Sequence, residues 1–208
     1  MNSLKKFDTA LLSRKIKLIG GTDEAGRGPI AGPVVAAAVM FDRKSFHPLI
    51  NDSKQVNETN REKLFDWIIG NCLCFGVGII EHDEIDKINI LQASLKAMKI
   101  SVEQLKPIPD LIIIDGNNSF HSEIKTKTII KGDAKSFSIA AASIIAKVTR
   151  DRIMKIIAEE YPEYLWHNNK GYPTKEHIAA VRKYGVSVHH RKTFLSRILI
   201  KECQDELF

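Results

Sequence analysis

The chain has 208 residues, 44% of them hydrophobic and 27% charged, a composition typical of one globular domain. Its longest uncharged apolar stretch, residues 30–41, contains Gly32 and Pro33 and is too short for a membrane-spanning helix, which needs about 20 residues. The N-terminal segment lacks the apolar core of a secretion signal. Three cysteines without a C-x-x-C pair suit a reducing compartment, so we expect a cytoplasmic protein with no membrane partner.

Charge is distributed unevenly along the chain. Residues 1–120 hold 15 Lys+Arg and 15 Asp+Glu, whereas residues 121–208 hold 16 and 10 and carry the whole net charge of +6. A basic surface of this kind favours a polyanionic partner such as nucleic acid. A solvated basic surface without a partner would show the same bias, so the charge alone does not decide the function.

The first part of the chain predicts strands with one helix between them. Apolar runs at residues 16–22 and 34–41 flank a glycine-rich turn and indicate an antiparallel pair of strands. Residues 72–80 alternate loosely around two glycines and indicate a third strand. The helix expected before this strand is amphipathic, with an apolar face of Leu64, Phe65, Ile68 and Ile69.

Helices dominate the rest of the chain. Short and longer helices are expected at residues 81–86 and 90–105, followed by a strand at 111–114 that is apolar throughout and therefore buried on both faces. A further short strand is expected at 128–131. Residues 138–160 predict a long helix, and its first half is so rich in small and apolar residues that it must be packed on nearly every side.

This order of elements predicts an α/β fold, a mixed sheet with flanking helices. No segment resembles a linker long enough to divide the chain, so residues 1–208 are expected to form a single catalytic domain. A helical C-terminal extension is expected over residues 174–200, and an acidic tail over 201–208.

Four carboxylates follow the predicted strands. Asp23 and Glu24 follow the first strand, Asp115 follows the buried strand, and Asp133 follows the strand at 128–131. Unpaired acids brought together repel one another unless a cation neutralises them, and an all-oxygen ligand set favours Mg²⁺ or Mn²⁺ over zinc. The alternative is that Asp133 caps a helix and Asp115 begins a turn.

A glycine-rich turn stands directly beside the first acids. The order Gly26-Arg27-Gly28-Pro29 lets backbone approach a ligand closely. Its spacing matches neither a Walker phosphate loop nor a dinucleotide fingerprint. A plain tight turn between two strands is the alternative.

These segments, taken in order, resemble the ribonuclease HII family. The run at residues 21–35, GTDEAGRGPIAGPVV, is long enough to be highly specific. Shorter matches cover nearly the whole chain: Asp52-Ser53-Lys54, Asn89-Ile90-Leu91, Ala97-Met98, Asp115-Gly116-Asn117, Lys131-Gly132-Asp133-Ala134, residues 138–151, Lys170-Gly171-Tyr172-Pro173-Thr174 and His190-Arg191. Two departures are Leu165, where the family usually has glycine, and Thr193, where it usually has serine. The short segment before the first strand is closer to this family than to ribonuclease HIII, which carries an extra N-terminal domain.

The resemblance implies an RNase H-like fold and hydrolysis of the RNA strand of RNA/DNA hybrids. It also implies incision 5′ to ribonucleotides embedded in duplex DNA, by a two-metal mechanism that leaves 5′-phosphate and 3′-hydroxyl ends. The metal ligands implied are Asp23, Glu24, Asp115 and Asp133. A non-catalytic nucleic-acid binding protein and a metal-dependent phosphatase are the alternatives that the residues leave open.

Recognition of one ribonucleotide requires detection of a single 2′-hydroxyl. In the family this is done by the backbone of Gly26, Arg27 and Gly28 and by the ring of Tyr172, which without the resemblance would be a half-buried core tyrosine. The resemblance further implies contacts with backbone phosphates from Ser53, Lys54, Lys147, Arg150 and Lys170. His190 and Arg191 match the family without a role assigned to them.

The end of the chain resembles a short peptide with which bacterial DNA-processing enzymes dock onto the sliding clamp. Gln204 would begin this motif, and Leu207 and Phe208 would be its apolar anchors. The match is partial, because Asp205 stands where the commonest version has leucine. The alternative is that Leu207 and Phe208 fold back onto the body of the protein.

Overall fold

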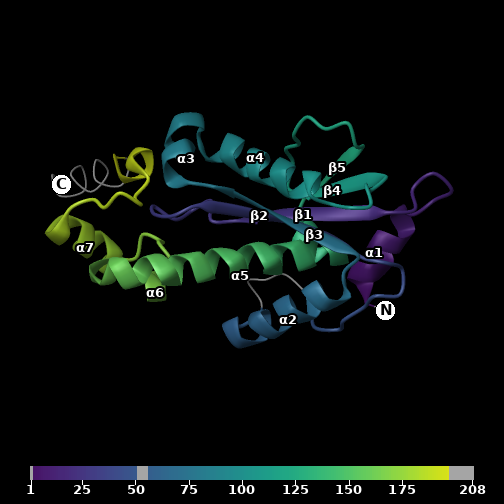
Figure 1. Ribbon diagram of the computed structural model, residues 1–208, viewed down its shortest axis with the longest axis horizontal. Helices are drawn as coiled ribbons and strands as arrows, with labels where there is room; N and C mark the ends of the chain where they lie inside the picture. Colours follow the sequence, from purple (N-terminus) through teal and green to yellow (C-terminus); the bar gives the residue numbers. More distant parts are fainter. Residues whose placement is uncertain (1, 51–55, 197–208) are drawn as a thin grey trace, which may run out of the picture.

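The computed structural model describes residues 2–50 and 56–196, and its centre is a mixed five-stranded sheet of order β3-β2-β1-β4-β5 (Figure 1). The strands are β1 (Ile19–Ala25), β2 (Val34–Met40), β3 (Cys74–Ile80), β4 (Leu111–Asp115) and β5 (Thr126–Ile129). β2 is antiparallel to both of its neighbours, whereas β1, β4 and β5 run parallel to one another. The expected antiparallel pair and the α/β class are confirmed.

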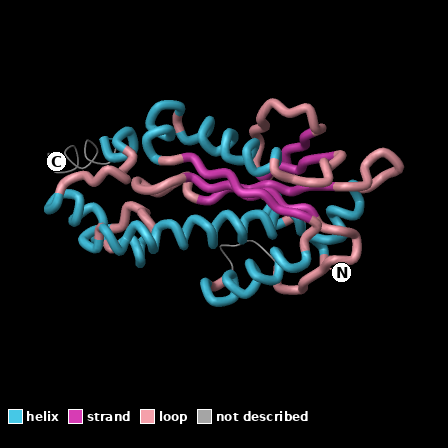
Figure 2. The backbone as a smooth tube through the Cα atoms, viewed as in Figure 1, coloured by secondary structure: helices cyan, strands magenta, loops and turns pink. Residues whose placement is uncertain are grey.

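Helices cover both faces of the sheet (Figure 2). They are α1 (Ser3–Leu11), α2 (Glu58–Asn71), α3 (His82–Ile88), α4 (Ile90–Glu103), α5 (Phe137–Glu160), α6 (Trp166–Asn169) and α7 (Lys175–Tyr184), with single 3₁₀ turns η1 (Gly132–Ala134) and η2 (Pro162–Tyr164). α4 packs on one face and α5 on the other, and α2 packs against α5. Of the described helices, none is both long and apolar enough to cross a membrane.

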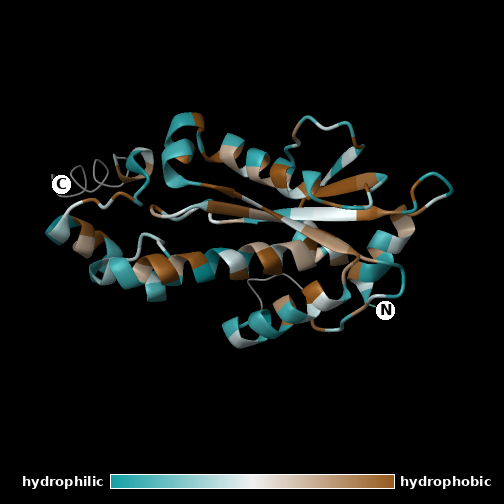
Figure 3. Cartoon of the chain, viewed as in Figure 1, coloured by the Kyte–Doolittle hydropathy of each residue, from teal (hydrophilic) through white to brown (hydrophobic). Residues whose placement is uncertain are grey.

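The long helix α5 supports the middle of the sheet. Its residues 137–146 are all buried, as their small and apolar composition predicts, and the strands above them are coloured mainly apolar (Figure 3). The Ser136 side chain caps the helix, and Asp8 of α1 accepts hydrogen bonds from the Ser138 N–H and hydroxyl at 2.9 and 2.8 Å. A Cβ at Gly21 of β1 would lie 2.5 Å from the start of the helix, so glycine allows this close contact.

Several boundaries differ from those expected. β1 begins at Ile19 and remains paired with β2 as far as Ala25, so Asp23 and Glu24 lie within the strand and not after it. β5 ends at Ile129, before Lys131, whose φ of 56° is incompatible with an extended strand. Helix α1 has no counterpart among the predicted elements.

The C-terminal part of the described chain is only partly helical. α7 ends at Tyr184 and is capped by Gly185, whose φ of 86° favours glycine. Residues 185–191 continue without helix before a helical segment at 192–196. Ala31 and His190 form an isolated antiparallel bridge. The non-helical segment therefore lies against the turn between β1 and β2, where the backbone of His190 pairs with that of Ala31.

Candidate active site

The four acids come together at one edge of the sheet. Thr22 of β1 is paired with Ile114 of β4, so the next residues, Asp23 and Asp115, stand at the same level on adjacent parallel strands. Asp133 lies in η1, and the neighbouring Gly132 N–H donates to Asp115 Oδ1 at 2.5 Å. The turn after β5 is thereby joined to the end of β4.

Burial and mutual repulsion raise the pKa values of the two acids on β1. Asp23 is only 7% exposed, and desolvation raises its pKa well above the usual range, with Glu24 and Asp115 adding to the rise. Desolvation also raises the pKa of Glu24, although the Arg27 guanidinium, 3.2 Å from Glu24 Oε1, opposes that shift. The site therefore holds more negative charge than its own cations neutralise.

This donor set fits a hard divalent cation. All candidate ligands are carboxylate oxygens, which suit Mg²⁺ or Mn²⁺. Within the described ranges, no three His, Cys, Asp or Glu side chains form a group that could hold a metal ion. Mg²⁺ commonly keeps several waters and is held by few carboxylates together with substrate phosphate, so it does not require a complete set of protein ligands.

The surface beside the acids is shallow. Glu24, Arg27 and Asp115 line a hollow of about 20 Å³ together with Ser94 of α4, whose buried hydroxyl has no hydrogen-bond partner among the residues described. A larger hollow of about 620 Å³ lies near Asp110, before β4 begins, and contains none of the four acids. An open edge suits a duplex substrate better than a small molecule.

The glycine-rich turn reaches the same edge of the sheet. Gly26 has φ 101°, and a Cβ there would lie 2.3 Å from Arg150 Nε, so this position requires glycine in both conformation and space. At Gly28 a Cβ would contact only the ring of Tyr172, at 3.5 Å. The turn and Tyr172, far apart in the sequence, therefore form one continuous surface.

Tyr172 is a surface residue. Tyr172 is 41% exposed, so it does not occupy the core position that its sequence context alone suggests. Lys147 Nζ and Arg150 Cζ each lie 6.0 Å from the centre of its ring. Two cations therefore lie near the ring, Gly28 lies beside its edge, and part of the ring remains exposed.

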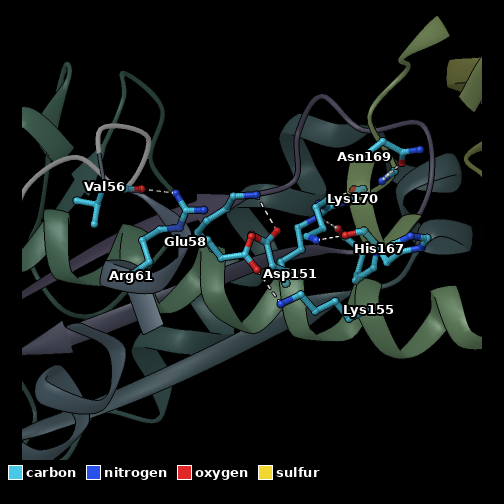
Figure 4. A network of polar contacts seen from close by, with 12 residues as sticks. Val56, Glu58, Arg61, Asp151, Lys155, His167, Asn169 and Lys170 are labelled. Atoms are coloured by element: carbon cyan, nitrogen blue, oxygen red, sulfur yellow. Dashed lines mark hydrogen bonds and ion pairs between the residues drawn. The ribbon is translucent and has the colours of Figure 1, made fainter. Parts of the chain in front are cut away.

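Basic side chains along α5 are paired with acids (Figure 4). Lys147 Nζ lies 2.7 Å from Asp151 Oδ1, and Lys155 Nζ lies 2.7 Å from Glu58 Oε1 of α2. Lys170 Nζ donates to the His167 carbonyl, and burial lowers the pKa of this lysine. The two lysines expected to contact phosphate, Lys147 and Lys170, therefore already have protein partners.

The expected phosphate contact of Arg150 is wrong for this structure. Arg150 is fully buried and donates to the carbonyls of Pro33, Ala31 and Lys170 at 2.9 to 3.1 Å. Because its three nitrogens are all used within the protein, it supports the turn and does not reach a ligand. Other expected site residues, namely Ser53, Lys54, Gln204, Leu207 and Phe208, lie outside the described residues.

Two residues left without a role in the sequence prove to contact the site's framework. Arg191 is fully buried and donates to carbonyls of the glycine-rich turn. His190 is also buried, and a chain of hydrogen bonds links it through His177 to the Tyr172 carbonyl. Their only sequence signal is the match His190-Arg191, which carries no chemistry by itself. Ser94 had no such signal.

Structural comparison shows the class of protein. The chain superposes on the crystal structure of ribonuclease H2 from Pyrococcus horikoshii OT3 with a TM-score of 0.71 and 29% identity, covering 85% of this chain and 93% of that one. At lower identity, the chain has the same fold as the RNase HII in a PCNA complex from Archaeoglobus fulgidus, with a TM-score of 0.70 and 23% identity, covering 84% of this chain and 94% of that one. It also matches Bst-RNase HIII in complex with Mn²⁺ (TM-score 0.63, 20% identity, 88% and 71% covered). The fold is RNase H-like, and the class is that of hydrolytic nucleases.

Sequence comparison narrows this class to one family. The family model for ribonuclease HII matches residues 20–203. Ribonuclease HII of Acetivibrio thermocellus is 50% identical over 194 residues, 93% of this chain and 76% of that protein. Ribonuclease HII of Rickettsia bellii is 51% identical over 177 residues, 85% of this chain and 89% of that protein. The chain belongs to the ribonuclease HII family, whose members are RNase H endonucleases that depend on divalent metal ions.

Proposed function

We propose that this chain hydrolyses the RNA strand of RNA/DNA hybrids and cuts 5′ to single ribonucleotides embedded in duplex DNA. The observation that carries the proposal is the position of the four carboxylates on the edge that also bears Gly28 and Tyr172. Acids for hydrolysis and a surface for recognition stand side by side. A binding module would not need the acids, and a phosphatase for small esters would not need so open an edge.

The proposed metal ligands are Asp23, Glu24, Asp115 and Asp133, holding two ions of Mg²⁺ or Mn²⁺. When bound, such ions supply an activated water and stabilise the departing 3′ oxygen, which leaves 5′-phosphate and 3′-hydroxyl ends. The chain's own part is to orient the acids: Asp23 Oδ1 accepts from the Glu24 N–H at 2.7 Å, and Asp115 accepts from the Gly132 N–H. These backbone donors hold each carboxylate in one orientation before an ion arrives.

Recognition is proposed to use the backbone of Gly26, Arg27 and Gly28 on the ribose 2′-hydroxyl. The exposed ring of Tyr172 would pack against the neighbouring deoxyribose, where a second 2′-hydroxyl fits poorly. Backbone phosphates are proposed to contact Lys147, Lys170, Ser53 and Lys54, the first two by exchanging a protein partner for a phosphate oxygen. DNA substrates of this kind are consistent with a cytoplasmic location.

The test is cleavage of an end-labelled duplex containing one ribonucleotide, with Mg²⁺, beside an all-DNA duplex and a long hybrid. We expect a single cut 5′ to the ribonucleotide and no cut in all-DNA. Tyr172→Ala should reduce this cut more than cleavage within the long hybrid, by about 1 to 3 kcal/mol of lost stacking. Wild-type turnover in the presence of a chelator, or equal losses on both substrates for Tyr172→Ala, would contradict these assignments.

We also propose that the tail binds a sliding clamp, through Gln204, Leu207 and Phe208. The support is the tail sequence, and the structure described for the Archaeoglobus fulgidus protein is a complex with PCNA. Deleting residues 204–208 should leave hybrid cleavage and the melting temperature unchanged and remove clamp binding. A melting temperature lowered by the deletion, with clamp association unchanged, would instead show that the tail folds back onto the body.

A further inference from the structure

Two buried arginines hold the turn between β1 and β2 by its carbonyl groups. Arg150 of α5 donates to Ala31 and Pro33 at 3.1 and 2.9 Å. Arg191 donates from Nε to Gly32 at 2.9 Å and from Nη1 to Pro29 and Arg27 at 2.9 and 3.4 Å. Five carbonyls of one short turn therefore face two guanidinium groups.

These contacts make the turn and the arginines depend on each other. Desolvation lowers the pKa of Arg150 to about 10, and desolvation together with Arg150 lowers that of Arg191 to about 9, so both remain charged near neutral pH. Two like charges buried this closely are stable only while carbonyl dipoles solvate them. A peptide of the turn that rotated away would leave a buried charged donor without its acceptor.

The arginines also set which groups the turn presents outward. In a planar trans peptide the C=O of one residue points opposite to the N–H of the next. With the Arg27 carbonyl directed at Arg191, the Gly28 N–H is directed away from Arg191. Arg191 thus orients the peptide that the proposed function assigns to the ribose.

His190, the residue next to Arg191, is linked to Tyr172 through a second buried histidine. His190 Nδ1 accepts from the Ser187 N–H at 3.0 Å, which leaves its proton on Nε2, 3.1 Å from His177 Nε2. His177 Nε2 also accepts from Trp166 Nε1 at 2.8 Å, so the His177 proton is on Nδ1. That N–H donates to the Tyr172 carbonyl at 2.8 Å. The hydrogen bonds assign both tautomers, and the series ends on the backbone of Tyr172.

The segment that carries both residues is itself tied down on two sides. The Gly32 N–H donates to the His189 carbonyl at 2.9 Å, and the Arg191 N–H donates to the Ile30 carbonyl at 2.8 Å. On the other side, Asp86 of α3 accepts from the N–H groups of Lys192 and Thr193 at 2.8 and 3.0 Å. The segment is therefore fixed between the glycine-rich turn and α3.

We propose that Arg150, Arg191 and His190 are positioning residues that fix the Gly28 peptide relative to the Tyr172 ring and so determine selectivity for a single ribonucleotide. All three are buried, so they would act through the turn and the Tyr172 backbone and not by direct contact with substrate. The inference rests on the proposed function. A duplex with one ribonucleotide offers one 2′-hydroxyl, so a displaced Gly28 peptide would fail to contact it. A long hybrid offers a 2′-hydroxyl at every position of the RNA strand, so cleavage there would be less sensitive to the displacement.

The experiment compares kcat/KM on the single-ribonucleotide duplex with kcat/KM on a long hybrid. Arg191→Lys and His190→Leu should lower the ratio of the two by roughly tenfold while hybrid cleavage persists. His190→Gln, which can keep a donor toward His177, should recover part of the ratio. Millimolar guanidinium should recover part of it for Arg191→Ala by filling the vacated site.

The matched control is Ile68→Val, a loss of core packing in α2 far from the turn, which should lower the melting temperature without changing the ratio. Equal losses on both substrates for Arg191→Lys and His190→Leu would overturn the inference, because they would show a purely structural role. If an Arg191 variant fails to fold, the comparison of His190→Leu with His190→Gln still tests the inference. A wild-type enzyme that makes no cut 5′ to the single ribonucleotide would instead contradict the proposed function.

Discussion

Asp23 illustrates at the scale of one residue how a site can be arranged against stability. Its carboxylate is buried near three other acids, and its pKa is raised, first by desolvation. A raised pKa means that the stabilising contribution is full below the ordinary pKa and is lost as pH rises through the raised value. The metal-free protein should therefore carry a destabilising charge at neutral pH.

We expect Asp23→Asn to remove cleavage and to stabilise the metal-free protein by about 1 kcal/mol at neutral pH. Melting in chelator at several pH values measures this, and the gain should shrink toward acid pH, where the wild-type carboxyl is neutral as well. Glu103→Gln, on the exposed side of α4, is the control and should show no such trend. An active Asp23→Asn enzyme, or one that is less stable at neutral pH, would contradict the assignment.

Leu165 has a left-handed backbone conformation with φ 54°. This conformation costs a non-glycine residue roughly 1 to 2 kcal/mol. Leu165→Gly should relieve that strain and leave stability equal or higher by up to about 1 kcal/mol, since the side chain is already 37% exposed. Leu165→Ala, which keeps the strain and loses the side chain, should melt below Leu165→Gly. The opposite order would show that the larger backbone entropy of glycine in the unfolded state outweighs the relieved strain.

At the scale of the element, β3 is an edge strand whose outer backbone is partly covered by one side chain. Gln104, just after α4, accepts from the Val77 N–H at 3.2 Å and donates to the Val77 carbonyl at 2.7 Å. Glycine at position 78 allows α4 to lie this close to β3, because a Cβ there would be 2.0 Å from the Ala97 carbonyl oxygen. The amide occupies the position that a further strand would take.

We expect Gln104→Ala to promote self-association through this edge, next to the exposed side chains of Phe75 and Ile79. Light scattering over a range of concentrations should detect it, with a loss of stability of about 1 kcal/mol from the missing hydrogen bonds. Adding Phe75→Lys should reverse this self-association, because a charge on an edge strand opposes pairing. A Gln104→Ala protein that scatters like the wild type at every concentration would show that the amide does not guard the edge.

At the scale of the whole molecule, the C-terminal part depends on neutral histidines. Tyr164 stacks on Trp166 at 4.9 Å, and both rings lie against the His177–His190 pair. Desolvation and His177 lower the pKa of His190 to about 4, and desolvation lowers that of His177. His189, near His82 and the carboxylates of Glu81 and Glu160, has a lowered pKa as well.

Stability should therefore fall on acidification. For a base whose pKa is lowered by folding, the unfolded state binds the proton first, so stability is full above about pH 6.5 and is lost as pH falls toward 4. We expect His190→Gln to remove about 1 to 2 kcal/mol of this pH dependence in melting experiments, whatever its stability at pH 8. His121→Gln, on an exposed loop, is the control and should retain the wild-type dependence of stability on pH. If His190→Gln showed the same dependence as the wild type, the proposed contribution of the His177–His190 pair would be wrong.

Most strands and the long helix could be predicted from sequence because their signals are local. An apolar run such as residues 111–114, or the small and apolar start of α5, must be buried wherever it lies. The acids were recognisable because each stands where such a run gives way to polar residues. The family motifs added their chemical meaning, since spacing alone left a cap or a turn equally open for Asp115 and Asp133.

Only the tertiary structure decided which charged residues are internal. Lys5 and Asp8 of α1 look like an ordinary solvated helix surface, yet both are buried, and Asp8 caps α5. Arg150 and Arg191 look alike and basic in sequence, and both are committed to carbonyls of a turn more than a hundred residues earlier in the chain. A buried charge is stable only where acceptors surround it, and those acceptors come from segments brought together by folding, so no local pattern could reveal them.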